Sequence, residues 1–221
     1  MENDIVYMKT VKGPLRVDCI YRRLDDTFLD PKAFYKGSVI GVPGLFKAWR
    51  KGNVGILNAI GTGVADDKVV YSYVNKMIVY YLGEQPILNQ VETYLCHDKI
   101  QMDYVIDNIS KLVVKPANAS GGYGIMIGPK APQKEREEVI AKIKKNPREF
   151  IAQPLEILST APTITKNDIE PRHLDLRPFV LSGKSTYVTT GGLTRVALRK
   201  GSTIVNSSQG GGSKDTLIVD I

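Results

Sequence analysis

Cysteine and histidine are scarce in this sequence, which holds two of each among its 221 residues. Cys19 lies in an apolar stretch and Cys96 directly precedes His97. Two cysteines argue against a disulfide scaffold and against a four-ligand zinc site, so we expect plain core or surface thiols. His173 is the other histidine, and neither imidazole neighbours a plausible nucleophile at a loop tip. No Ser-His-Asp or Cys-His arrangement therefore stands out.

Long hydrophobic runs are also missing. No run approaches the roughly 18 apolar residues of a membrane span, and the N-terminal Met-Glu-Asn-Asp lacks the basic and apolar regions of a signal peptide. We therefore expect a cytoplasmic protein without a membrane partner. The composition is 43% hydrophobic, which allows a core of mixed helices and strands in one large domain or two small lobes.

The basic charge of the chain is dispersed. The formal net charge is +7, which would suit a nucleic-acid partner if the lysines and arginines were clustered. The densest basic group, at 142–145, follows an acidic segment at 135–138. This order is typical of one solvated helix whose charges complement the macrodipole. We accordingly expect no nucleic acid as a partner.

Residues 112–128 form the most distinctive stretch of the sequence. The β-branched and apolar residues at 112–115 predict a strand that ends at Pro116, and residues 123–127 predict a second strand. The stretch therefore predicts a β-hairpin with a large glycine-rich tip.

Three glycines at the tip, Gly121, Gly122 and Gly124, can adopt positive φ angles and bring backbone N–H groups close to an anion. Lys115, at the end of the first strand, would add a cation. A loop that needs glycine only to turn is the alternative interpretation.

The other elements follow from periodicity and turn residues. Apolar residues at three- and four-residue spacing predict a helix that follows Asp66 or Asp67, buries its apolar stripe and stops at Gly83. Further helices are predicted at 45–49, at 98–110 and after Pro132, strands at 54–57, 150–154 and 217–219, and a loop with a short strand at 85–95. Three more strands, at 187–190, 194–198 and 203–205, are predicted to form an antiparallel meander with connections at Gly191-Gly192 and Lys200-Gly201. The glycine- and serine-rich stretch at 206–215 predicts a loop that could bind an anion.

Two charged groups leave alternatives open. Arginines at 22–23 and aspartates at 25–26 suit either an internal ion-pair network that holds a loop or a site that grips an anionic substrate. Asp175 and Arg177 lie on one face of a predicted strand, where a structural ion pair is the alternative to a binding role.

Six ordered strings resemble the circularly permuted ATP-grasp family, bacterial proteins related to glutathionylspermidine synthase. The strings are Tyr-Arg-Arg-Leu-Asp-Asp at 21–26 with Leu-Asp-Pro at 29–31, Gly-Thr-Gly-Val-Ala-Asp-Asp-Lys at 61–68, Leu-Val-Val-Lys-Pro at 112–116 with Ser-Gly-Gly-Tyr-Gly at 120–124, Ile-Ala-Gln-Pro at 151–154, Arg-His-Leu-Asp-Leu-Arg-Pro at 172–178, and Asn-Ser-Ser-Gln-Gly-Gly-Gly-Ser-Lys-Asp at 206–215.

The resemblance implies an α+β fold in which two α/β lobes clasp ATP beneath a glycine-rich hairpin loop. Residues 1–221 would form one ATP-grasp-like unit, with one lobe at 1–110 and 184–221 and the other, which clasps the nucleotide, at 111–183. The residues implied to bind ATP are Lys68, Lys115, Ser120, Gly121, Gly122, Gly124, Gln153, Pro154, Leu155 and Glu156, and those implied to act in catalysis are Arg22, Arg23, Arg177 and Asn206.

The implied reaction is that of a carboxylate–amine or carboxylate–thiol ligase, which uses ATP and Mg²⁺ to form an acyl phosphate. The two lysines would contact the phosphates and adenine, the 120–124 loop would close over the triphosphate, and the backbone at 153–156 would read the adenine edge. Arg177 would lie near the phosphates, while Arg22, Arg23 and Asn206 would lie near the acceptor carboxylate. Small-molecule or peptide substrates are the expected partners. A nucleotide-binding or assembly module without ligase activity is the alternative.

One departure from the family concerns the metal. Family members carry an upstream Glu-Asp-Asn string that resembles metal ligands, and this chain has no counterpart before Met1. The candidates present, Asp25, Asp26, Asp175 and Asn206, lie in strings that the resemblance does not mark as metal ligands. We therefore leave the metal ligands unassigned and expect an upstream-encoded segment to complete the fold. The chain alone is expected to bind ATP without forming an amide bond at an appreciable rate.

Overall fold

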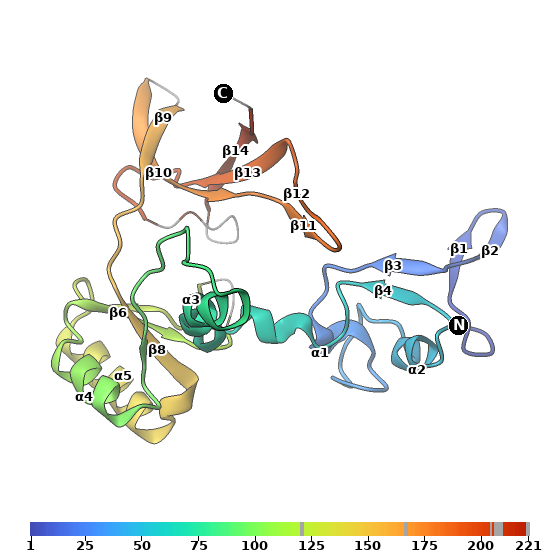
Figure 1. Cartoon of the computed structure of the whole chain (residues 1–221), viewed down its shortest axis with the longest axis horizontal. Coiled ribbons are helices and arrows are strands. Elements are labelled where there is room, and N and C mark those ends of the chain that lie inside the picture. Colours follow the sequence, from blue (N-terminus) through green and yellow to red (C-terminus); the bar gives the residue numbers. More distant parts are fainter. Residues whose placement is uncertain (120–121, 166–167, 204, 206–209, 220–221) are drawn as a thin grey trace. The chain divides into compact units, whose positions relative to one another are not determined.

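The computed structural model describes residues 1–119, 122–165, 168–203, 205 and 210–219. The chain divides into two compact units, Met1–Leu88 and Asn89–Ile221 (Figure 1). Helices and antiparallel strands occur together, which agrees with the expected α+β class. The lobes expected from the sequence, at 1–110 with 184–221 and at 111–183, follow a different division and stay a prediction.

The first unit contains two small strand pairs and four helical segments. The strands β1 (Tyr7–Thr10) and β2 (Gly13–Arg16) form an antiparallel hairpin, and β3 (Cys19–Tyr21) pairs in parallel with β4 (Gly55–Leu57). The helical segments are α1 (Asp26–Leu29), α2 (Leu45–Arg50), the 3₁₀ helix η1 (Thr62–Asp66) and α3 (Lys68–Leu82). The short helix predicted at 45–49 is confirmed as α2.

The core of the first unit joins α1 and α2 to the parallel strands. Its buried residues are Val6, Leu29, Leu45, Ala48, Val54 and Ile56. Beside them lies Asp30, which is 1% exposed. Its carboxylate accepts hydrogen bonds from the backbone N–H groups of Lys32 (2.8 Å), Gly44 (3.0 Å) and Phe46 (2.9 Å). This carboxylate therefore ties the end of α1 to the start of α2.

Helix α3 has the predicted limits, because the Asp67 side chain caps its first turn and Gly83 ends it in the left-handed conformation. The prediction that its apolar stripe is core was wrong. No residue of α3 is buried, and Val74 and Tyr81 are exposed. The spacing of apolar residues indicates that a helix has an apolar face, but it does not indicate whether another element covers that face.

The second unit contains a four-stranded sheet in the order β5-β8-β6-β7. The strands are β5 (Tyr94–Leu95), β6 (Leu112–Pro116), β7 (Met126–Ile127) and β8 (Phe150–Pro154), and every neighbouring pair is antiparallel. The pairing of β6 with β7 agrees with the expected hairpin, although the second strand is shorter than the predicted 123–127. The predicted strand at 150–154 is confirmed as β8.

Two helices cover one face of this sheet. They are α4 (Lys99–Asp107), which begins after the capping side chain of Asp98, and α5 (Gln133–Lys145), which is followed by the 3₁₀ helix η2 (Pro147–Glu149). Both helices were predicted from their periodicity. Val105 and Ile143, each 0% exposed, pack in one cluster with Leu112, Val114 and Ala152 from the sheet.

A second antiparallel sheet has the order β14-β13-β10-β9. Its strands are β9 (Thr160–Ile164), β10 (Ile169–Arg177), β13 (Gly191–Val196) and β14 (Gly212–Leu217), and the hairpin of β11 (Val180–Ser182) and β12 (Thr186–Val188) lies between β10 and β13 in the chain. The expected meander is not formed by the predicted strands, because β12 pairs with β11 and β13 lies between β10 and β14.

Two details of the second sheet differ from the sequence predictions. Gly191 and Gly192 begin β13 instead of linking two strands, because their backbone pairs with β14. The glycine-rich stretch predicted as a loop at 206–215 contributes Gly212–Leu217 as a strand, while residues 206–209 lie outside the described residues. The predicted strand at 203–205 cannot be followed because residue 204 also lies outside them.

We predict that Asp30→Asn lowers the free energy of unfolding at neutral pH by about 1–3 kcal/mol, because it turns an amide N–H₂ toward backbone donors. Burial alone would raise the pKa of Asp30, but the three backbone N–H donors hold it below the ordinary aspartate value. The carboxylate's contribution is therefore complete above the ordinary pKa and is lost as the pH falls through the lowered one.

Urea denaturation of both proteins across acidic pH measures this difference. Asp18→Asn is the matched control, because Asp18 is 82% exposed in its ion pair with Arg16. Equal losses in the two variants would contradict the structural role of Asp30.

Candidate functional site

The sheet of the second unit has a second face, opposite the helices, where predicted site residues meet. The β6–β8 register pairs Val113 with Gln153 and Lys115 with Ile151. Since side chains alternate along a strand, Lys115 and Gln153 point to the same side, away from the face that packs on α4 and α5. The β5–β8 register, extended by one residue from Tyr94, sets Thr93 opposite Gln153 on this side.

These polar side chains form a continuous hydrogen-bond chain that joins β6, β8 and the residue before β5. The Lys115 ammonium donates to Oε1 of Gln153 at 2.5 Å. Nε2 of Gln153 donates to the hydroxyl of Thr93 at 2.8 Å, and that hydroxyl donates to the backbone carbonyl of Val91 at 3.0 Å. Gln153 is only 7% exposed, so its amide depends on these partners.

Residues on either side of this face continue the predicted nucleotide site. Pro154 ends β8, and Leu155 and Glu156 follow with exposed side chains. In the predicted loop, Gly122 and Gly124 have φ angles of 81° and 71°. These values lie in the left-handed region of the backbone, for which glycine is the favoured residue.

At Gly124 a Cβ atom would also lie 2.9 Å from Cγ of Pro116, so the loop approaches the end of β6 closely. Ser120 and Gly121 lie outside the described residues.

Arg22 lies in the first unit and is 9% exposed, with its guanidinium surrounded by acceptors. It donates to the backbone carbonyls of Asn58 (2.6 Å), Leu24 (2.6 Å) and Ala59 (2.8 Å). It also forms an ion pair with Asp26 at 2.6 Å, and Asp26 accepts a hydrogen bond from the backbone N–H of Gly61 at 2.9 Å. The contacts of Arg22 and Asp26 therefore match an internal network that holds the loop at 58–62, and not a site that grips an anionic substrate.

The remaining predicted arginines differ from Arg22. Arg23 and Arg177 both have exposed side chains. Asp175, the partner considered for Arg177, instead forms an ion pair with Arg195 on the neighbouring strand β13, and this ion pair raises the pKa of Arg195. Asn206 lies outside the described residues.

Lys68 is the first residue of α3 and is partly buried. Burial lowers the pKa of its ammonium, and the neighbouring carboxylate of Asp67 opposes that change only in part. Lys68 belongs to the first unit and Lys115 to the second. The prediction that one ATP molecule touches both lysines stays a prediction.

Among the residues that the structure describes, the candidate oxygen ligands do not fit a magnesium site. Within the described ranges, no group of three or more His, Cys, Asp or Glu side chains could hold a metal ion. Asp25 caps α1 through the N–H of Thr27, Asp26 pairs with Arg22, and Asp175 pairs with Arg195.

Burial raises the pKa of the Cys96 thiol to about 11, so this thiol is inert at neutral pH. Cys19 is an exposed free thiol, and the prediction of plain thiols is confirmed for both.

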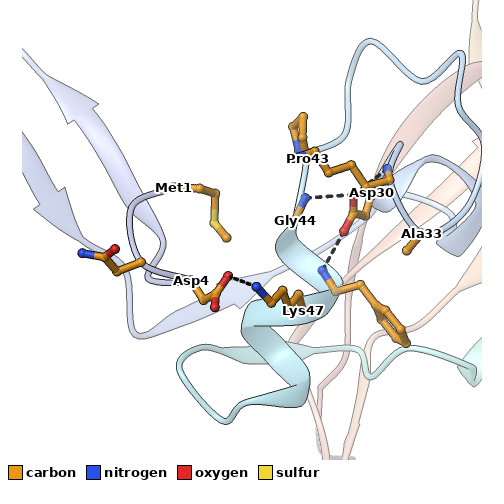
Figure 2. Close-up of a pocket in the computed structure, with 10 residues that line it drawn as sticks. Met1, Asp4, Asp30, Ala33, Pro43, Gly44 and Lys47 are labelled. Atoms are coloured by element: carbon orange, nitrogen blue, oxygen red, sulfur yellow. Dashed lines mark hydrogen bonds and ion pairs between the residues drawn. The ribbon is translucent and has the colours of Figure 1, made fainter.

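A surface hollow of about 780 Å³ lies in the first unit, and no predicted site residue is among those that line it. Figure 2 shows Asp30 directed toward Gly44, and Asp4 toward Lys47. The carboxylates of Asp30 and Asp4 are thus engaged within the hollow. The lining residues are Met1, Asn3, Asp4, Asp30, Lys32, Ala33, Pro43, Gly44, Phe46 and Lys47.

Sequence reasoning missed Thr93. It lies 60 residues before Gln153, in a stretch expected to be loop and short strand, and only the pairing of β5 with β8 brings the two together.

In the part of the chain that the structure describes, no helix is long and apolar enough to cross a membrane.

Comparison with known proteins gives a consistent result. The sequence model described as circularly permuted ATP-grasp type 2 matches residues 1–197. A relative from Synechocystis is 55% identical over 213 residues, which cover 96% of this chain and 44% of that protein. A relative from Mycobacterium tuberculosis is 54% identical over 215 residues, which cover 97% of this chain and 39% of that protein.

A third relative, from Frankia casuarinae, carries the name "Putative glutamate--cysteine ligase 2-2". It is 49% identical over 217 residues, which cover 98% of this chain and 25% of that protein. The chain thus spans less than half the length of these three relatives.

We predict that Arg22→Ala lowers the free energy of unfolding of the first unit by about 1.5–3 kcal/mol or more, because it leaves Asp26 and several carbonyl groups without their charged donor. Chemical denaturation of the two proteins measures the effect. Arg23→Ala is the matched control, because the adjacent arginine is exposed. Similar stabilities for the two variants would contradict the loop-holding role of Arg22.

Proposed function

This chain belongs to the circularly permuted ATP-grasp type 2 family, and we propose that it forms the nucleotide-binding portion of an ATP-dependent ligase. The observation that carries the proposal is the pair of Lys115 and Gln153 on the face of the sheet opposite the helices. A lysine ammonium held at the end of a strand, beside a loop with left-handed glycines, suits the recognition of phosphate oxygens.

In the proposed arrangement, three parts of the chain contact different parts of ATP. Lys115 and Lys68 contact phosphate oxygens, and the backbone amides of the 120–124 loop close over the triphosphate. The backbone at 153–156 receives the adenine edge, since the strand ends there and its peptide groups are no longer all used by the sheet. This division is supported by family membership and by the placement of Lys115 and Gln153 on one face.

The reaction that we propose is the activation of a carboxylate by ATP to an acyl phosphate, followed by attack of an amine or a thiol. Phosphoryl transfer needs positioning and neutralisation of charge more than covalent help from the protein. The Frankia casuarinae relative, which carries a glutamate–cysteine ligase name, supports a ligase with small-molecule substrates. We propose no step through magnesium, because the described carboxylates do not fit such a site.

The arginines take different roles in this proposal. Arg22 supports the loop at 58–62, because its donors are already engaged there. Arg23 and Arg177 have exposed side chains and are the better candidates for anionic substrate groups, with Arg177 near the phosphates and Arg23 near the acceptor carboxylate. Asn206 remains a candidate at the acceptor site.

We predict that Lys115→Ala weakens the binding of ATP about 10- to 100-fold, because a charge-assisted hydrogen bond contributes about 1.5–3 kcal/mol. Isothermal titration calorimetry with ATP measures the change. Lys144→Ala is the matched control, since Lys144 is an exposed lysine on α5, which packs on the opposite face of the sheet. An affinity that is unchanged in Lys115→Ala, or equally reduced in both, would argue against this site.

We also predict that, as the pH is raised, ATP affinity begins to fall at a lower pH than it would if Lys68 had the pKa of an ordinary lysine. The ammonium of Lys68 attracts phosphate only while it is charged, and burial lowers the pKa at which this charge is lost. Raising the pH through that lowered pKa therefore removes the attraction, and binding must then be accompanied by proton uptake.

Calorimetry at alkaline pH in buffers of different ionisation enthalpy detects the proton uptake. The Lys68→Arg variant stays charged throughout and should lose this uptake. Proton uptake of equal size in the wild-type protein and in Lys68→Arg would show that another group is responsible.

A further inference from the structure

The hydrogen-bond chain on the sheet face has a fixed direction. The carbonyl of Val91 can only accept, so the Thr93 hydroxyl donates its one proton to it. The hydroxyl oxygen then presents a lone pair to the amide of Gln153, which must answer with Nε2. The remaining amide atom, Oε1, consequently faces the ammonium of Lys115.

The opposite amide orientation is unfavourable at both ends of Gln153. It would set Nε2 against the Lys115 ammonium, so that donors face donors, and it would set Oε1 against the lone pair of a hydroxyl whose proton is used elsewhere. Because Gln153 is buried, water does not readily replace a lost partner. The hydroxyl of Thr93 therefore selects the orientation that gives Lys115 an acceptor.

The neutral charge of Gln153 matters as much as its orientation. A neutral amide oxygen holds the ammonium in place while the pair keeps a net charge of +1. A carboxylate at the same position would hold the ammonium equally well, but it would cancel the charge that attracts an anion. The chain of Thr93, Gln153 and Lys115 thus fixes a cation without neutralising it.

We propose that Thr93 and the side-chain amide of Gln153 are positioning residues that orient the Lys115 ammonium toward the phosphates of ATP. This inference rests on the proposed function, and it adds Thr93 and a second role for Gln153, whose backbone alone was assigned to adenine. Neither side chain needs to touch the nucleotide, because each acts through the next member of the chain.

Two substitutions test the inference in the 221-residue chain by calorimetric titration with ATP. Thr93→Val keeps the shape but removes the hydroxyl, and we expect affinity to fall about 2- to 12-fold, the range for one neutral hydrogen bond. Thr93→Ser keeps the hydroxyl and should restore most of the affinity. Equal affinities for Thr93→Val and the wild-type protein would overturn the role of Thr93.

Gln153→Glu separates positioning from a purely structural role. The variant forms an ion pair with Lys115, so the thermal unfolding midpoint should be kept or raised, while ATP affinity should fall at least tenfold. A structural role alone predicts unchanged affinity. If Thr93→Val fails to fold, Gln153→Glu still tests whether the neutral amide of Gln153 positions the Lys115 ammonium.

Lys115→Ala distinguishes failure of the nucleotide site from failure of the positioning role. Unchanged ATP affinity in Lys115→Ala would overturn the nucleotide site itself, and the positioning role with it. A clear loss in Lys115→Ala, together with wild-type affinity in Gln153→Glu and Thr93→Val, would overturn the positioning role and leave the nucleotide site standing.

Discussion

The antiparallel register between β6 and β8 is the constraint on which the second unit depends. It directs Val114 and Ala152 toward the core beneath α4 and α5, and it directs Lys115 and Gln153 to the other side. A slip of one residue would turn Lys115 toward the core beneath α4 and α5 and would turn Val114 away from it. Burial of the apolar face therefore also fixes the polar arrangement on the opposite face.

Local sequence signals predicted the elements of the fold well where neighbouring residues decide the outcome. The cap at Asp67 and the stop at Gly83 gave the limits of α3, and the positive φ angles at Gly122 and Gly124 followed from the absence of a Cβ atom. Contacts with other elements were harder to predict. The stripe on α3 is not core, and Gly212–Leu217 is a strand because β13 supplies its hydrogen-bond partners.

In the candidate site, too, local features were predictable from the sequence and contacts between distant residues were not. Lys115 was found because its position at a strand end beside glycines is visible in the sequence, and the strings around it resemble a known family. The engagement of Arg22 by the carbonyls at 58–59 was not predictable, since it joins residues that are 36 and 37 positions apart. Thr93 could not be found at all, because threonine carries no distinctive signal and its partner comes from strand pairing.

The central claim is that the face bearing Lys115 and Gln153 receives ATP. A crystal structure of the chain with a non-hydrolysable ATP analogue tests it most directly. The account predicts a phosphate oxygen within hydrogen-bonding distance of Nζ of Lys115 and the adenine against the backbone at 153–156. An analogue bound elsewhere, such as in the hollow beside Asp4 and Lys47, with Lys115 still held only by the protein, would contradict it.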